Sequence, residues 1–474
     1  MGAQGSRTPL TDTQKRLLLY GVPTVAVLLL LALIWFLGRL AAPGKDQDWT
    51  SIDYAAMPEV DLLRRYLRID TSQATGSEVA GAEFLAAELR RMGLEPTVEV
   101  LADKHANVWA ILEGENPEAL VLHSHIDVYP IVEPETWTFD PFGATIDQAW
   151  LYGRGVFDMK SVTVVQLLAL QRLVERGRPP KQSVIFLATG SEEVGSELGA
   201  RWILDHHPEL ANRFEVVLTE GGIVEPIDRE VIKYWGVEFG QKRFVDGVFC
   251  AQTKEQLEAL IPTILGLNEL QVAEVITDEV RLFANSYGPS RDNPLYRDAL
   301  LDPDGLFRDA NRFRQLPLYL RALFRNEIAP FEVESNPEGG FRMRFKIHLL
   351  PGQTLAGARE RLLPEWFTHG LTVQLGEPMG AEHGSEVDHR AFVALAEAVK
   401  GVYPKATVGP LFLSWSATDS RFFRQRGINS YGFSPFVIFS TDSLRVDGPN
   451  ERMSLPGYIS GFEIYRDAVF RIAG

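Results

Sequence analysis

Cysteine is nearly absent from this chain, and no stretch of it is strongly basic. The 474 residues include a single cysteine, Cys250, so no disulfide can form within the chain. This leaves the compartment open, because proteins without disulfides also occur in a periplasm or a lumen. A formal net charge of -16, without a basic segment, argues against nucleic acid as a partner. The length allows two or three domains with ample cores, and no internal repeat is evident.

One long uncharged hydrophobic run is present, at residues 17–38. Its length is about what a bilayer core of roughly 30 Å requires. A cleaved signal peptide is the alternative, but the run is long for one and ends in aromatic residues that suit a membrane interface. We therefore expect an uncleaved single-pass anchor. Basic residues precede the run, which predicts a cytoplasmic amino terminus and a periplasmic, lumenal or extracellular remainder.

Strand patterns alternate with helical patterns through much of the remaining chain. Short apolar runs at residues 119–122, 183–188 and 214–218 read as strands, and a long apolar helix is expected at 158–176. This alternation predicts an α/β fold, a mainly parallel sheet with helices on both faces. Near Pro226 the pattern of predicted strands and helices changes to that of a smaller α+β domain, within which residues 271–334 are predicted to be helical. The α/β pattern returns from about Glu386.

Ionisable residues follow each of the three apolar runs. His125 and Asp127 follow the first, Glu192 and Glu193 the second, and Glu220 the third. Taken singly, each has an ordinary reading as a core histidine, a first-turn carboxylate of a helix or a turn residue. Together they place an imidazole and carboxylates at the carboxyl ends of strands, where an open α/β sheet builds its sites. We therefore expect a metal site there.

A glycine-rich turn at residues 153–155 brings one more carboxylate, Asp158. A helix N-cap is its ordinary reading. With this turn included, the motifs resemble those of the aminoacylase, carboxypeptidase G and carboxypeptidase S group of di-zinc metallopeptidases, peptidase clan MH. The resemblance rests on residues 125–130, 137–143, 152–160, 192–195, 220–222, 349–352, 418–421, 431–435 and 448–452. These motifs cover nearly everything after residue 50 except the middle of the inserted domain.

The resemblance implies a site for two zinc ions. His125 and Glu220 would hold one ion, Glu193 would hold part of the other, and Asp158 would bridge them. Asp127 would orient the imidazole of His125, as carboxylates beside metal-bound histidines commonly do.

The same resemblance implies how the site would act. Glu192 would be the general base, which moves a proton while two metal ions activate water and polarise the scissile carbonyl. Arg421 and Asn450 would bind the substrate, Arg421 by pairing with a substrate carboxylate. A helix residue after a Thr418–Asp419 cap is the ordinary reading of Arg421.

Two positions depart from the family pattern. Asp447 stands where the family has a histidine that binds the second metal, and a carboxylate there shifts the preference toward harder metals, so manganese or cobalt could replace zinc. The inserted domain also lacks the family's oxyanion-binding histidine, because no histidine occurs between His207 and His348. Loss of one oxyanion donor lowers the rate by a factor on the order of a hundred or more.

We therefore expect a membrane-anchored metallohydrolase that cleaves an amide bond next to a free carboxylate, in a dipeptide or an N-acyl amino acid. The alternative is a weakened or silent homologue that binds a metal, a ligand or a partner. A homodimer formed through the inserted domain is a further expectation from the family. The expected domains are an anchor with its linker at 1–48, a catalytic domain in two parts at 49–228 and 379–474, and an inserted lid and dimerisation domain at 229–378.

Overall fold

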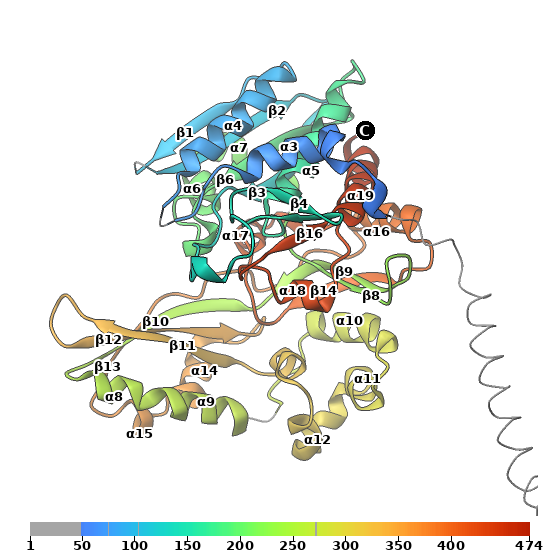
Figure 1. Ribbon diagram of the computed structural model, residues 1–474. Helices are drawn as coiled ribbons and strands as arrows, with labels where there is room; N and C mark the ends of the chain where they lie inside the picture. Colours follow the sequence, from blue (N-terminus) through green and yellow to red (C-terminus); the bar gives the residue numbers. More distant parts are fainter. Residues whose placement is uncertain (1–48, 74, 103, 271–272) are drawn as a thin grey trace, which may run out of the picture. The chain divides into compact units, whose positions relative to one another are not determined.

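The computed structural model describes residues 49–73, 75–102, 104–270 and 273–474. The expected membrane segment, residues 17–38, lies outside these ranges. Among the residues that are described, no helix combines the length and the apolar character needed to cross a membrane. Residues Asp53–Gly474 form one compact unit, whose elements are drawn in Figure 1.

A nine-stranded sheet is the main layer of this unit. Its strand order is β1-β2-β6-β3-β7-β15-β9-β14, with β8 paired to β9. The central strands β6, β3, β7 and β15 are parallel to one another, and so are β9 and β14. The pairs β1–β2, β2–β6, β8–β9 and β15–β9 are antiparallel. The strands are β1 (Thr97–Leu101), β2 (His105–Leu112), β3 (Asn116–His125), β6 (Gln182–Thr189), β7 (Phe214–Thr219), β8 (Ile223–Pro226), β9 (Ile232–Gln241), β14 (Val408–Leu413) and β15 (Asn429–Gly432). The predicted α/β class is confirmed, and the sheet is mixed around a parallel centre.

The central strands are apolar along their length because helices cover the sheet on both faces. Every residue of β6 is buried, as are the last seven of β3. One face carries α3 (Pro58–Leu67), α4 (Glu78–Arg91), α5 (Lys160–Val174), α16 (Arg390–Val402) and α19 (Leu455–Ala473). The other carries α6 (Ala200–His206), α7 (Pro208–Ala211) and α17 (Ser420–Gln425), which pack on Val121, Ile185 and Val217 of the strands.

A second, four-stranded sheet is antiparallel throughout. Its order is β11-β12-β10-β13, and helices α8, α9 and α14 cover the side that holds its apolar core. The elements are β10 (Arg243–Ala251), β11 (Glu327–Ser335), β12 (Phe341–Leu349), β13 (Thr372–Leu375), α8 (Lys254–Glu258), α9 (Leu260–Leu270), α14 (Leu355–Leu362) and α15 (Glu365–Thr368). This sheet lies inside the range expected for an inserted domain, but β9 of that range belongs to the large sheet, and the domain boundaries stay a prediction.

The described part of the segment between α9 and β11 is mostly helical. It contains α10 (Asp278–Tyr287), α11 (Pro294–Leu301), α12 (Ala310–Arg314) and α13 (Leu318–Arg321), and α10 packs on β14 of the large sheet. The helix predicted for this segment is wrong at 327–334, because these residues pair with β12 as an antiparallel strand.

A small three-stranded sheet joins two distant parts of the chain. It contains β4 (Thr145–Asp147), β5 (Trp150–Tyr152) and β16 (Arg452–Ser454), and Arg452 pairs with Tyr152. The turn with Asp158 follows β5, and residues 447–451 precede β16. The sheet therefore sets these two segments side by side.

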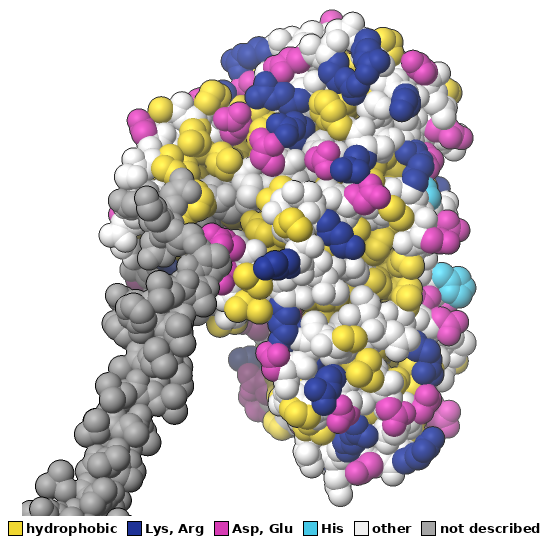
Figure 2. Space-filling view, turned by 90° about the vertical axis from the view of Figure 1, so that its right-hand side faces the viewer, with side chains coloured by type: hydrophobic (Ala, Val, Ile, Leu, Met, Phe, Trp, Pro, Cys, Tyr) yellow, Lys and Arg dark blue, Asp and Glu magenta, His cyan; other side chains and the backbone are white. Residues whose placement is uncertain are grey.

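On the face shown in Figure 2, lysine and arginine side chains alternate with acidic ones among the described residues. No continuous basic patch of the kind that nucleic acid requires is formed on that face by the residues the structure describes.

Candidate active site

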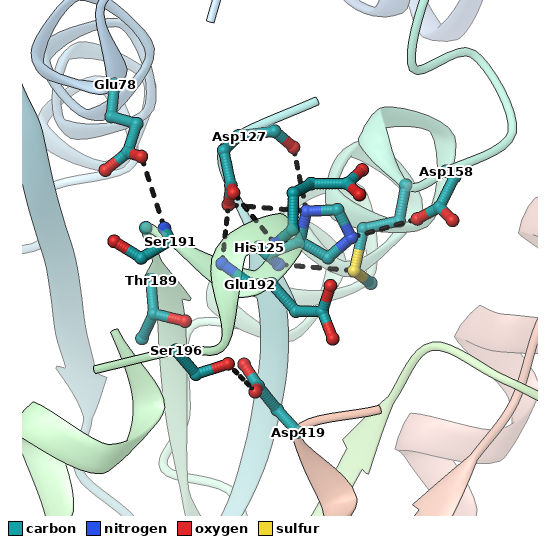
Figure 3. Close-up of polar contacts among 12 residues, drawn as sticks. Glu78, His125, Asp127, Asp158, Thr189, Ser191, Glu192, Ser196 and Asp419 are labelled. Atoms are coloured by element: carbon teal, nitrogen blue, oxygen red, sulfur yellow. Dashed lines mark hydrogen bonds and ion pairs between the residues drawn. The ribbon is translucent and has the colours of Figure 1, made fainter. Parts of the chain in front are cut away.

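The strand-end residues of the large sheet meet at one edge. His125 ends β3, Glu192 and Glu193 follow β6, and Glu220 follows β7. These three strands are parallel neighbours in the order β6-β3-β7, so their carboxyl ends lie together. Asp158 reaches the same place from the turn before α5. Figure 3 shows His125, Asp158 and Glu192 converging there.

The imidazole of His125 is held by its Nδ1 atom. Nδ1 lies 2.8 Å from the backbone oxygen of Asp127, and a carbonyl can only accept, so Nδ1 carries the proton. Nε2 then faces two carboxylates, 2.9 Å from Asp158 Oδ1 and 3.5 Å from Glu220 Oε2. A neutral imidazole in this tautomer offers Nε2 to a metal ion. Burial lowers the pKa of His125, but the neighbouring Glu220 and Asp158 outweigh it and raise this pKa well above its usual value.

The carboxylate of Asp127 holds the turn after β6. Oδ1 accepts the backbone N–H of Glu192, and Oδ2 accepts that of Glu193, each at 3.0 Å. Its distance to His125 Nδ1 is 3.7 Å, which is too long for a hydrogen bond. Asp127 therefore orients His125 through its backbone oxygen, and its carboxylate fixes the base and ligand candidates.

Four carboxylates surround His125, and most of them have raised pKa values. Burial, with the charge of Asp419, raises the pKa of Glu192 to about 8. Burial, with the charge of Asp158, raises the pKa of Glu193 to about 10 and that of Glu220 well above its usual value. Burial acts the same way on Asp158, but its hydrogen bond to His125 outweighs this and lowers its pKa.

The close packing of these carboxylates is suited to binding a cation. The ligand atoms of His125, Glu192 and Glu220 lie within 4.8 Å of one another, as do those of His125, Asp158 and Glu193. Repulsion between buried carboxylates is relieved either by protons or by a bound cation. An imidazole together with carboxylates is a donor set that divalent zinc, manganese and cobalt all accept.

Asp447 comes to the same cavity from the segment before β16. Burial, with the charge of Asp158, raises its pKa to about 7. Oδ1 of Asp447 and Oε1 of Glu193 are both buried without a hydrogen-bond partner in the described structure. Buried oxygens are rarely left unpaired, so these two atoms fit a second metal position. Asp447 belongs to neither of the tight ligand groups above.

The remaining candidates are Arg421 and Asn450. Arg421 is buried, its Nη1 lies 3.4 Å from the backbone oxygen of Thr418, and it forms no ion pair with the described residues. Both ends of the Asn450 amide are engaged, because Oδ1 accepts from Thr138 N at 2.7 Å and Nδ2 donates to Thr136 O at 3.1 Å. Neither residue lines the cavity beside the cluster: the Arg421 guanidinium lies over the Phe422 ring, and Asn450 holds residues 136–138.

A cavity of about 920 Å³ opens onto this cluster. Asp158, Glu192, Glu193, Glu220 and Asp447 all line it. Its other walls combine apolar residues, among them Ile223, Leu413, Phe436, Ile438 and Phe439, with the charged side chains of Glu225, Lys233, Arg291 and Asp292. The space is of the size that holds a small molecule or a short peptide.

Two pairs of residues that support the site were not predicted from the sequence. Glu78 and Gln73 contact the turn and Asp127, and Arg154 with Glu451 holds the turn that carries Asp158. Glu78 resembles an ordinary acidic residue in the first turn of a helix, and nothing local marks Gln73. Glu451 lies inside the motif at 448–452, which was the one signal available for it.

A buried lysine was also not predicted from the sequence. Lys160 is fully buried at the start of α5 and donates from Nζ to the backbone oxygen of Ile69 at 2.6 Å. Burial lowers its pKa to about 7.

Comparison with known proteins identifies the class that this fold and site define. The model of peptidase family M20/M25/M40 matches residues 121–471. Because the match covers well over half of the chain, the protein belongs to this family of metallopeptidases and amidohydrolases, and it is an enzyme of that class.

Particular relatives support this assignment. Aminoacylase-1A of Rattus norvegicus is 25% identical over 436 residues, which cover 88% of this chain and 95% of the relative. Aminoacylase-1 of Homo sapiens is 24% identical over 426 residues, covering 86% and 93%. The resemblance to aminoacylases and carboxypeptidases is thereby confirmed.

Solved structures share the fold at lower identity. A metallo-carboxypeptidase of the M20 family from Sulfolobus solfataricus aligns with a TM-score of 0.67 and 19% identity, over 88% of this chain and all of the other. Human carnosine dipeptidase 1 aligns with a TM-score of 0.64 and 14% identity, over 90% and 98%. A dinuclear metal-binding M20 peptidase from Bacillus subtilis aligns at 0.51 with 12% identity, over 87% and 97%. Enzymes of this family depend on two metal ions, generally zinc.

Proposed function

We propose that this protein hydrolyses an amide bond next to a free carboxylate, in an N-acyl amino acid or a dipeptide. The observation that carries the proposal is the cluster of His125 with Asp158, Glu192, Glu193 and Glu220 on one cavity. Keeping these mutually repelling groups together is costly unless a cation binds among them, and hydrolysis by metal-activated water requires such a cation.

The metal positions follow from the donors. His125 and Glu220 would hold one ion, Glu193 and Asp447 would hold the other, and Asp158 would be shared between them. When bound, the two ions polarise the scissile carbonyl and lower the pKa of the attacking water. The second set has oxygen donors only, which favours manganese over zinc relative to a set with a histidine.

Glu192 would act as the general base. Glu192 lines the cavity beside the proposed metal ligands, where a carboxylate that does not hold a metal ion can take up a proton and return it. It accepts a proton from the attacking water as the bond from oxygen to carbon forms. It then donates that proton to the nitrogen as the bond from carbon to nitrogen breaks. Asp127 keeps Glu192 in place by accepting its backbone N–H.

Arg421 would pair with the substrate carboxylate. A guanidinium binds a carboxylate through two parallel hydrogen bonds, and this one is buried without an ion pair among the described residues. Thr418, whose carbonyl lies beside Arg421, lines the cavity. The predicted substrate contact of Asn450 stays a prediction, since both ends of its amide hold residues 136–138.

The test measures metal content and turnover together. Purified protein is supplied with zinc or manganese and assayed on N-acyl amino acids and dipeptides, beside Glu192→Gln. We expect Glu192→Gln to keep its metal and to lower kcat by about 10²–10⁴-fold. Glu197→Gln is the matched control, because Glu197 is a highly exposed neighbour of the same turn and should leave kcat unchanged.

A second candidate is a metal- or ligand-binding protein with little catalysis. Two observations favour it, the carboxylate of Asp447 at a histidine position and the lack of any histidine between His207 and His348. Metal bound without turnover on any substrate would establish this candidate. Turnover that is equal in Glu192→Gln and in the unmodified protein would exclude Glu192 as the base.

The proposal also includes the membrane attachment and the oligomeric state of the enzyme. The hydrophobic run at 17–38 supports a membrane anchor with the enzyme outside the cytosol, and the family resemblance supports a homodimer through 229–378. Extraction of membranes with carbonate tests the first, since an anchored protein stays in the pellet. Light scattering of the detergent-solubilised full chain tests the second.

A further inference from the structure

A chain of hydrogen bonds links helix α4 to the turn that carries Glu192 and Glu193. Glu78, the first residue of α4, accepts the backbone N–H of Ser191 at 3.2 Å, which Figure 3 shows. The amide Nε2 of Gln73 donates to Glu78 Oε1 and to Asp127 Oδ2, each at 2.9 Å. Asp127 in turn accepts the backbone N–H groups of Glu192 and Glu193. Three successive backbone amides are therefore fixed by two carboxylates.

Gln73 is the connector between these carboxylates. Glu78 is 3% exposed and Asp127 is fully buried, so both lie where repulsion is poorly screened. An NH₂ group has two hydrogens, and here one points to each carboxylate. The amide thus relieves the repulsion and sets the spacing between them. Burial, with the charge of Asp127, raises the pKa of Glu78, which shows that the pairing carries an electrostatic cost.

The contacts of Glu78 are not those of a helix cap. Its carboxylate bonds to His105 Nδ1 at 2.9 Å and to Ala106 N at 3.1 Å on strand β2, and to Ser191 N after strand β6. A carboxylate that only stabilised its own helix would face the free N–H groups of the first turn. Glu78 instead connects two strands.

The turn is pressed closely against this carboxylate. A Cβ atom placed on Gly190 would lie 1.8 Å from Glu78 Oε2, so a larger residue there would displace this carboxylate. Ser191 adopts a positive φ of 62°, which the bond to its backbone N–H supports. The backbone before Glu192 is therefore positioned from the side of α4.

We propose that Gln73 and Glu78 are positioning residues for the active site, which hold the Ser191–Glu193 backbone so that the Glu192 and Glu193 side chains face the cavity. The inference rests on the proposed function for the roles of Glu192 and Glu193. Residues that orient a metal ligand through hydrogen bonds commonly change metal affinity or activity by about 10–100-fold when they are altered.

The experiment compares Gln73→Ala with Thr75→Ala in the full chain. Both residues lie in the loop before α4, but Thr75 bonds to Asp70 and not to Asp127. Three readouts are taken: hydrogen exchange of the peptide that spans residues 191–195, the visible absorption of Co²⁺-loaded protein, and kcat with KM. Thermal unfolding shows whether either variant is globally destabilised.

We expect Gln73→Ala to speed exchange at 191–195 by tenfold or more, to alter the Co²⁺ spectrum, and to lower kcat about 10–100-fold with KM changed less than about threefold. Gln73→Glu, which places a third carboxylate between the two, should lower Co²⁺ affinity further. Thr75→Ala should match the unmodified protein in each readout.

The inference is overturned if hydrogen exchange at residues 191–195 is equally fast in Gln73→Ala and in Thr75→Ala. It is also overturned if this exchange is faster in Gln73→Ala while the Co²⁺ spectrum and kcat stay unchanged. Protein that binds Co²⁺ but turns over no substrate refutes the proposed function, and exchange and spectrum still decide the positioning role. If Co²⁺ does not bind at all, exchange alone decides it.

Discussion

Arg154 and Glu451 form a buried ion pair across 297 residues of sequence, with 2.7 Å between Nη1 and Oε2. Glu451 also accepts the backbone N–H groups of Gly155 and Phe157, at 3.0 and 2.8 Å. Arg154 donates from Nη2 to the backbone oxygen of Asp447 at 2.8 Å. The pair therefore holds the turn of Asp158 and the segment of Asp447 in one arrangement.

Removal of Glu451 should destabilise the protein strongly. Glu451→Ala leaves the Arg154 guanidinium buried without its partner, which typically lowers the free energy of unfolding by about 3–5 kcal/mol. Urea unfolding checks this value. Glu397→Ala is the control, because Glu397 pairs with Arg471 on the surface and its loss should change stability by about 0–1 kcal/mol. Equal effects of the two substitutions would show that the buried pair has no special role.

Asp447→His should change the metal preference. Imidazole is a softer donor than carboxylate, so the variant should bind zinc more tightly relative to manganese than the unmodified protein does. Asp447 has a φ of 58°, which histidine tolerates better than most residues. Competition between the two metals, followed by metal analysis, gives the ratio. An unchanged ratio would mean that Asp447 does not contact a metal ion.

Arg421→Ala should remove the preference for substrates with a free carboxylate. The test compares each N-acyl amino acid with its carboxamide. In the unmodified protein the free acid should have the higher kcat/KM, and the variant should lose this advantage through a higher KM. Arg426→Ala is the control, since Arg426 is an exposed arginine just after the same helix and pairs with Asp205. A preference that survives in Arg421→Ala would exclude the pairing.

Acid should destabilise the protein in part through His348. Burial, with the charge of Lys242, lowers the pKa of this histidine to about 3. The unfolded chain takes up the proton near pH 6.5 and the folded chain does not, so stability is lost as pH falls from about 6.5 toward 3.

The matched variant is His348→Phe, which keeps a ring to pack against Phe244. Its loss of stability over that window should be smaller by up to roughly 1.4 kcal/mol per pH unit. Urea unfolding at a series of pH values measures both proteins. Parallel pH profiles would show that His348 titrates alike in the folded and unfolded chains.

The sequence by itself determined the class and the outline of the site. Buried apolar strands followed by His125, Glu192, Glu193 and Glu220 predict a parallel sheet with a metal site, because parallel strands end at one edge. The structure brings these residues together with Asp158, as expected. The departure at Asp447 was also visible in sequence, because it falls inside a motif of fixed spacing.

Only the tertiary structure decided how these residues are held. The contacts of Gln73 with Asp127 and of Arg154 with Glu451 span 54 and 297 residues, and no local pattern encodes them. The role of Asp127 also changed, since its carboxylate holds the turn and its backbone oxygen meets His125. The strand at 327–335 was missed because its pairing with β12 overrode a weak local preference. Periodicity reports which face of an element is buried, whereas hydrogen bonds between distant segments exist only after the chain has packed.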